Sequence, residues 1–189
     1  MNNPLDTTFF DKAVKFAIEA HSGTERRGKG YPYIIHPMEA ASIVATITND
    51  QEMLAAAILH DTVEDTDVTI EQIREQFGDR VAELVQHETA PMDESLTWRE
   101  RKAIQVKQLC DAPYDSKVVA LGDKLSNMRA IARDYAEKGD SLWDLFHAKD
   151  RKDHEWHYRG LADSLKDLSD TGAYKEFLGL INQVFAPEE

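Results

Sequence analysis

Apolar residues recur at helical spacing over almost the whole chain, and no stretch alternates apolar and polar residues long enough to predict a strand. Between residues 9 and 20 the apolar side chains return every three or four positions, as on one face of an amphipathic helix. Segment 51–59 is almost entirely apolar, which is typical of a helix at the centre of a bundle. The pattern predicts an all-α fold, a bundle of about eight to ten helices.

Turn and cap residues predict where these helices begin and end. Glycines interrupt the pattern over 23–33, and Pro37 suits the first turn of a helix that runs to about residue 47. Thr69 and Gln72 have the spacing of a capping box, for a helix that Gly78 would end. Further helices are predicted over 79–86, 98–109, 115–137, about 150–168 and 174–184, with a loop over 87–97.

The length of 189 residues is that of one typical domain, and the chain contains no repeat, low-complexity tract or interdomain linker. We expect a single domain over residues 1–189, with its core over about 9–168 and a C-terminal helix over about 172–185. The only cysteine, Cys110, cannot form a disulfide bond within the chain, which favours a cytoplasmic protein. No run of about 18 apolar residues could span a membrane, and the N-terminus shows no export signal.

The formal net charge of −13, from 22 basic and 35 acidic residues, argues against a nucleic-acid partner. Nucleic-acid binding depends largely on contacts between lysine or arginine and phosphate groups. A small anionic substrate is compatible with this charge if a metal ion or a local basic cluster reverses its sign in one cleft. The sequence leaves the oligomeric state open.

Candidate metal ligands lie at three places in the sequence. His60 and Asp61 are adjacent at the end of the apolar segment 51–59, where the core would meet a cleft. Such a pair is also common without a metal, and two neighbouring ligands cannot complete a site. His36 precedes a proline at a predicted helix start, and Asp123 is a carboxylate on an otherwise apolar helix face, where it should be paired or coordinating.

Residues 31–37, 56–66 and 122–129 resemble the hydrolase domain of RelA/SpoT-type proteins, within the HD phosphohydrolase superfamily, and especially the stand-alone small alarmone hydrolases. The resemblance covers about residues 9–168. It implies an HD-type helical bundle with metal-dependent phosphohydrolase activity, which removes the 3′-pyrophosphate of (p)ppGpp-like alarmones and releases pyrophosphate and GDP or GTP. It also implies that one divalent metal ion, usually Mn²⁺, is held by His36, His60, Asp61 and Asp123.

The same resemblance assigns Glu64 and Asp65 to the water that attacks the substrate, which they would orient and deprotonate. Without it, these two carboxylates could equally belong to a solvated acidic surface. Asn127 follows Asp123 by four residues and shares its helix face, where it could hydrogen-bond the ribose or the attacking water.

Basic residues would provide the contacts to an anionic substrate. The resemblance places Arg27 against the purine ring and Lys102 near the distal phosphates. Lys29 lies in the same glycine-rich loop as Arg27, for which a solvated basic turn is the alternative. Lys124 and Arg151 are weaker candidates, since solvated positions on a helix would explain them equally well.

Two alternatives to a (p)ppGpp hydrolase stay open. The first is an HD phosphohydrolase that acts on another purine nucleotide, (p)ppApp or NADPH. Gly28 and Lys29 replace the lysine and small polar residue usual in the family, which leaves the choice between guanine and adenine open. The other is a non-catalytic alarmone-binding module, which would not need Glu64 and Asp65. The histidines without ligand partners at useful spacing are expected to be structural or on the surface, namely His21, His87, His147, His154 and His157.

Overall fold

The structure, a computed structural model, describes residues 6–89 and 95–186. Within these residues it contains ten α-helices, two short 3-10 helices and, in place of a sheet, one isolated bridge between Glu25 and Pro32. The predicted all-α bundle of about eight to ten helices is confirmed. The elements in chain order are α1 (Thr8–Ala20), α2 (Ile35–Val44), α3 (Gln51–Leu59), α4 (Thr62–Asp65), α5 (Ile70–Phe77), α6 (Asp79–Glu88), α7 (Trp98–Asp111), α8 (Tyr114–Lys138), η1 (Gly139–Leu145), α9 (Arg151–Ser164), η2 (Lys166–Leu168) and α10 (Gly172–Val184).

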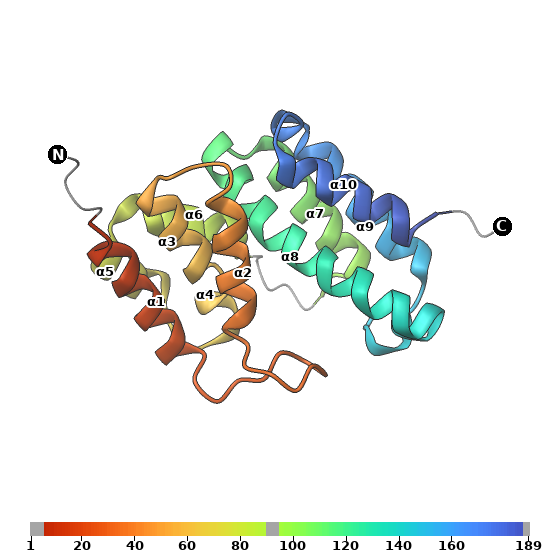
Figure 1. The fold of residues 1–189 in the computed structure, drawn as a ribbon, viewed down its shortest axis with the longest axis horizontal. Coiled ribbons are helices and arrows are strands. Elements are labelled where there is room, and N and C mark those ends of the chain that lie inside the picture. The colour runs from red at the N-terminus through yellow and green to blue at the C-terminus, as the bar shows by residue number, and fades with distance from the viewer. Residues whose placement is uncertain (1–5, 90–94, 187–189) are drawn as a thin grey trace.

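The long helix α8 runs through the middle of the bundle, as Figure 1 shows. Helices α2, α3 and α6 pack against it on one side, and α10 with α7 packs against it on the other. Helices α1 and α5 form the far end of the first group, where α1 contacts α3 and α5 contacts α6. Because α8 touches both groups, a side chain on α8 can meet residues from either half of the chain.

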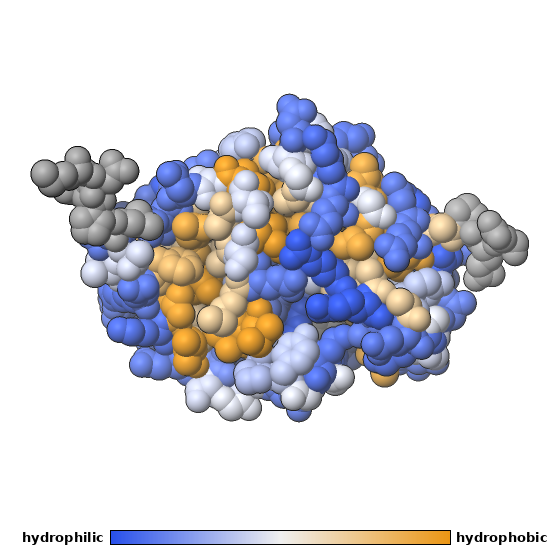
Figure 2. All heavy atoms as spheres, in the orientation of Figure 1, coloured by the Kyte–Doolittle hydropathy of each residue, from blue (hydrophilic) through white to orange (hydrophobic). Residues whose placement is uncertain are grey.

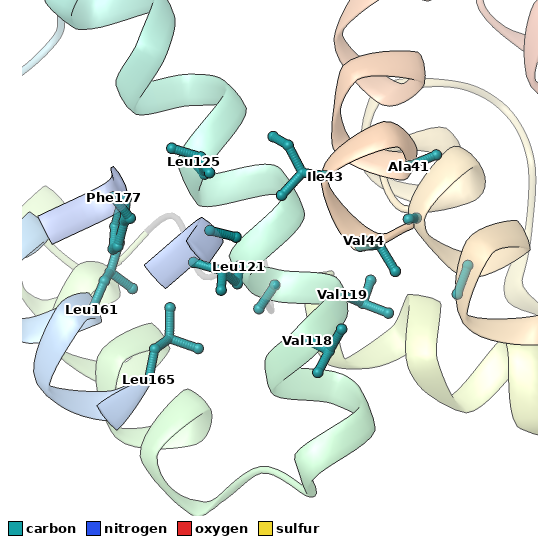
Figure 3. Packing of buried hydrophobic residues seen from close by; sticks show 14 of the residues in the cluster. Ala41, Ile43, Val44, Val118, Val119, Leu121, Leu125, Leu161, Leu165 and Phe177 are labelled. Atoms are coloured by element: carbon teal, nitrogen blue, oxygen red, sulfur yellow. The ribbon is translucent and has the colours of Figure 1, made fainter. Parts of the chain in front are cut away.

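The buried core follows this arrangement, as the close view in Figure 3 shows. Val118 and Val119 of α8 lie toward Val44 of α2, whereas Leu121 lies on the side of Leu161 in α9. These side chains are almost completely shielded from solvent. The apolar residues of α8 are therefore distributed around the helix, as expected for one buried on several sides.

Gly122 allows α2 and α8 to approach each other closely. A Cβ atom at this position would lie 2.8 Å from the carbonyl oxygen of Ala40 and 2.8 Å from Cγ2 of Val44. Only glycine leaves room for this contact. The close approach matters for function, because His36 is on α2 and Asp123 is the next residue on α8.

Local capping signals account for several helix ends. Thr69 and Gln72 form both hydrogen bonds of the predicted capping box at the start of α5, and Gly78 ends that helix with a φ of 90°. Pro37 lies in the first turn of α2, as predicted, although this helix ends at Val44 rather than near residue 47. A second capping box, between Thr97 and Glu100, begins α7.

Some boundaries differ from the predictions. Helix α6 continues to Glu88, so the predicted loop over 87–97 begins later, and its central residues 90–94 lie outside the described residues. The helix predicted over 150–168 ends at Ser164 and is followed by the separate turn η2. The short elements α4 and η1 were not predicted, because four and seven residues are too few for a periodic pattern.

The surface in Figure 2 is uneven in polarity. Apolar side chains gather over the region of α1, α2 and α3, whereas much of the other half of this face is hydrophilic. Ile18, Ile35 and Met38 are large apolar residues of α1 and α2 that stay exposed. Among residues 6–89 and 95–186, no helix combines the length and hydropathy needed to cross a lipid bilayer.

Candidate metal centre and pocket

Ligand atoms of His36, His60 and Asp61 all lie within 4.8 Å of one another, and Asp123 lies close to both imidazoles. His36 is in the first turn of α2, His60 and Asp61 join α3 to α4, and Asp123 is on α8. Nε2 of His36 lies 3.0 Å from Oδ1 of Asp123 and 3.4 Å from Oδ2 of Asp61. Nε2 of His60 lies 3.0 Å from Oδ2 of Asp61 and 3.5 Å from Oδ1 of Asp123. The structure thus brings together all four residues that the sequence suggested as ligands.

Hydrogen bonds on the other ring nitrogens orient both imidazoles. Nδ1 of His60 lies 2.9 Å from the carbonyl oxygen of Ala57, which can only accept, so Nδ1 carries the proton. Nδ1 of His36 lies 2.8 Å from Oγ of Ser126, whose own hydroxyl donates to Glu39. Ser126 therefore accepts from His36, and in both rings it is Nε2 that faces the cluster.

The donor set fits a divalent cation. Nε2 of His60 is buried and makes no hydrogen bond with any residue that the structure describes, which is costly for a buried polar nitrogen unless something else binds it. Metal–ligand bonds of about 2.1 Å separate neighbouring ligand atoms by about 3.0 Å in an octahedron and about 3.4 Å in a tetrahedron. The separations of 3.0–3.5 Å between the imidazole nitrogens and carboxylate oxygens match both values.

The charges around this point keep both aspartates ionised. Burial by itself would raise the pKa of Asp61 and Asp123, but in the metal-free protein the positive charge of a protonated His60, with Lys124 beside Asp123, holds the pKa of each carboxyl well below its usual value. Against the effect of burial, the two carboxylates in turn raise the pKa of His60, whose proton a bound cation would replace. Tyr33 also donates a hydrogen bond of 2.6 Å to Oδ2 of Asp61. Burial and the Asp61 charge raise the pKa of Tyr33, so its hydroxyl stays a donor.

A polar cavity of about 220 Å³ opens beside the four ligands. It is lined by Glu64 and Asp65 from α4, Lys102 from α7, and Lys124 and Asn127 from α8. All five were singled out in the sequence, so the structure gathers them with the ligands around one space. Desolvation, followed by the negative charges of Asp61 and Asp65, raises the pKa of Glu64. Burial, with help from the neighbouring Lys124, lowers the pKa of Lys102.

Asn127 is engaged on both sides of its amide. Its Nδ2 donates to Oδ1 of Asp123, and its Oδ1 accepts from the guanidinium of Arg26. Arg26 lines the cavity and lies over the ring of Tyr33, 5.3 Å from its centroid. Sequence reasoning chose the neighbouring Arg27, whose side chain is exposed and does not line the cavity.

Two other predicted substrate-binding residues also lie away from this cavity. Lys29 forms an ion pair with Asp134 and lines a neighbouring cavity of about 630 Å³, which shares Arg26 and His36 with the first. Arg151 donates to the carbonyl oxygens of Val184 at 3.0 Å and Ala186 at 2.8 Å. The guanidinium of Arg151 therefore caps the end of α10.

Sequence reasoning missed several residues around the ligands. Tyr33, Ser126 and Glu39 hold the ligands in place, and the first two lie inside the segments that carry the family resemblance. His157 was expected to be structural or on the surface, yet it is buried and lines the cavity. Nothing in the local sequence around His157 indicated that it would line the cavity, because its place there depends on the packing of α9 against α7, which is a long-range contact.

Comparison with known proteins supports one family. The chain is 41% identical over 135 residues to the zebrafish (Danio rerio) guanosine-3′,5′-bis(diphosphate) 3′-pyrophosphohydrolase MESH1, covering 69% of this chain and 73% of that protein. It is 38% identical over 146 residues to the putative GTP diphosphokinase RSH1 of Arabidopsis thaliana, of whose length it spans only 16%. The solved structure of a metazoan SpoT orthologue that hydrolyses ppGpp has the same fold, with a TM-score of 0.76 at 24% identity, covering 96% of this chain and 97% of that one. The HD domain family matches residues 13–150, and this chain is therefore a member of the HD domain family.

Proposed function

We propose that this chain is a metal-dependent phosphohydrolase that removes the 3′-pyrophosphate of a (p)ppGpp-like nucleotide, releasing pyrophosphate and GDP or GTP. The observation that carries the proposal is that two histidines and two aspartates share one cavity with Glu64, Asp65 and Lys102. Such a reaction needs metal ligands, a carboxylate to take a proton and a cation for phosphate. The zebrafish and human relatives, of which the chain covers 73% and 69%, are named for this activity.

We propose Mn²⁺ as the metal, as the family resemblance implies; two imidazoles and two carboxylates without a cysteine suit Mn²⁺, and equally Fe²⁺ or Co²⁺. A cation held by His36, His60, Asp61 and Asp123 would polarise a phosphoryl group and lower the pKa of a water molecule. Hydrogen bonds from Tyr33 to Asp61, and from His36 to Ser126, fix these ligands before any cation arrives.

Glu64 is the group that we propose to accept the proton of the attacking water. A base works best when its pKa lies near the pH at which it operates, and desolvation and the charges of Asp61 and Asp65 raise the pKa of Glu64 in that direction. Asp65 contributes by this charge and by its place on the same wall of the cavity. Asn127 supports Asp123 through its amide, which makes it a positioning residue in this reaction.

Lys102 is the better candidate for contact with the substrate phosphates. Among residues 6–89 and 95–186, its Nζ donates only to the side chain of Gln105, at 2.8 Å, a neutral partner that a phosphate oxygen can replace. Lys124 is already shared between Asp123 and Glu88. We place the nucleoside in the neighbouring cavity of about 630 Å³, where Arg26 supplies positive charge and Lys29 is paired with Asp134.

An assay of product release tests the proposal. Purified protein with Mn²⁺ should release pyrophosphate from ppGpp and pppGpp, and should lose this activity in EDTA. Parallel reactions with ppApp, NADPH and dGMP measure the choice of base and the need for a 3′-pyrophosphate. Release of single phosphates only, or no turnover of any of these nucleotides, would contradict the proposal. Faster turnover of ppApp or NADPH than of ppGpp would identify that nucleotide as the substrate instead.

We further propose that residues 1–189 act as one hydrolase domain, because α10 packs against both α8 and α9. A cytoplasmic location is proposed from the single free cysteine, Cys110, which lies exposed on α7 and suits a reducing compartment.

A further inference from the structure

Glu88 lies beside the metal ligands although no step of the proposed reaction uses it. It is the last residue of α6, and its side chain lines the cavity while only 5% of it is exposed. A carboxylate this deeply buried is costly unless a cation compensates its charge. The cavity therefore contains one more acidic side chain in addition to Asp61, Asp123, Glu64 and Asp65.

Lys124 supplies the compensating charge. Its Nζ lies 3.0 Å from Oε2 of Glu88 and also donates to Oδ2 of Asp123. A single ammonium group thus links the end of α6 to a metal ligand on α8. Glu88 is the one of these two partners that comes from outside α8, so it fixes the direction in which the Lys124 side chain extends.

This link separates the two oxygens of Asp123 by role. Oδ2 is occupied by Lys124, whereas Oδ1 lies 3.0 Å from Nε2 of His36 and 3.5 Å from Nε2 of His60. A carboxylate held in this way presents one oxygen to a cation at a fixed orientation. Without Glu88, the ammonium of Lys124 could turn into the cavity and release Oδ2 of Asp123.

The charge of Glu88 acts in the same direction as its geometry. Lys124 by itself would place a positive charge next to a site for a divalent cation, and like charges repel. The ion pair with Glu88 offsets that charge. We propose that Glu88 is a positioning residue of the metal centre, which acts through Lys124 on Asp123 and raises the affinity of the site for metal. The inference rests on the metal site of the proposed function and not on the identity of the nucleotide.

Titration calorimetry with Mn²⁺ alone, without nucleotide, tests this role. Glu88→Gln should raise the Kd for Mn²⁺ about threefold to tenfold, less than the 10- to 100-fold typical of a residue bonded directly to a ligand. Glu83→Gln is the matched control, because Glu83 is exposed on the same helix and its loss changes the net charge equally. Equal Kd values for the Glu88 and Glu83 variants would overturn the inference.

A second pair of variants tests whether the effect passes through Lys124. Lys124→Met leaves Glu88 buried without a cation, so the Tm of this variant should fall below that of wild type. Adding Glu88→Gln to it should recover part of that loss. In the Lys124→Met background, Glu88→Gln should change the Kd for Mn²⁺ by less than about twofold. The same change in both backgrounds would show that Glu88 acts without Lys124, which also overturns the inference.

The two proposals fail in different ways. Wild-type protein that binds no Mn²⁺ would overturn both the metal site and the role of Glu88. Protein that binds Mn²⁺ with the expected effect of Glu88→Gln, but hydrolyses none of the nucleotides, would contradict only the proposed reaction.

Discussion

Replacing Gly122 by alanine tests the close packing that brings the metal ligands together. The new Cβ atom would lie 2.8 Å from Ala40 O and 2.8 Å from Val44 Cγ2, whereas ordinary contacts are 3.4–4 Å. A backbone oxygen cannot rotate away, so α2 and α8 must move apart by about 0.5 Å. That movement separates His36 from Asp123, whose ligand atoms are 3.0 Å apart.

The expected magnitude combines two opposing effects. Overpacking costs about 1–3 kcal/mol, and the better helix propensity of alanine returns about 1 kcal/mol. The free energy of unfolding should therefore fall by about 1 kcal/mol, which lowers the Tm of a chain of this size by about 2–4 °C. Metal sites tolerate displacements of only about 0.5 Å, so the Kd for Mn²⁺ should rise about tenfold.

Gly179→Ala is the matched control. Gly179 is inside α10, and a Cβ atom there would meet nothing within 4 Å, so alanine should stabilise the protein by about 1 kcal/mol. Differential scanning calorimetry of metal-free protein, and titration with Mn²⁺, measure the two quantities. The reasoning is refuted if Gly122→Ala matches Gly179→Ala in both Tm and metal affinity.

Four further outcomes test the chemistry and electrostatics of the cavity. Glu64→Gln keeps the shape of the side chain but removes the base, so kcat should fall about 10²–10⁴-fold with bound Mn²⁺ unchanged; loss of the metal would instead make Glu64 a ligand. Since the pKa of Glu64 is raised, wild-type kcat/KM should fall as the pH drops through that pKa, and stopped assays of the variant should lack this limb. Asp123→Ala should lose both metal and activity while circular dichroism stays helical, and retention of metal would exclude Asp123 as a ligand. Burial and the charges of Lys102 and Lys124 lower the pKa of His157 to about 2, so below a pH of about 6.5 the unfolded chain binds a proton that the folded chain does not. His157 should therefore contribute a loss of about 2 kcal/mol to the free energy of unfolding between pH 7 and pH 5. In urea unfolding, the loss for His157→Gln should be smaller than that of wild type by this amount.

Helices and their caps were predictable because their signals are local. The capping box of Thr69 and Gln72 needs only residues three apart, and the structure contains both of its hydrogen bonds. The four potential ligands were also found, because His36, His60 and Asp61 lie at predicted helix ends and Asp123 interrupts an apolar face.

Contacts between distant parts of the chain could not be predicted in this way. Arg26 and Arg27 are equivalent in sequence, and only the path of their loop turns Arg26 rather than Arg27 into the cavity. Arg151 cannot be distinguished in sequence from other basic residues on helices, because the two carbonyl oxygens that it contacts lie at the distant end of α10. Glu88 lies near the start of the loop predicted over 87–97, and its pairing with Lys124 depends on how α6 packs against α8.

The ligands on α2 and α8 are separated by more than eighty residues of chain. A cation shared by His36 and Asp123 would therefore act as a reversible cross-link, comparable to a disulfide bond that closes a long loop. Its strength would depend on supply, because each tenfold rise in free metal above the Kd adds about 1.4 kcal/mol to the stability of the folded state. Metal starvation would then loosen the junction between the two halves of the bundle as well as slow catalysis, so thermal stability itself would report the metal status of the cell.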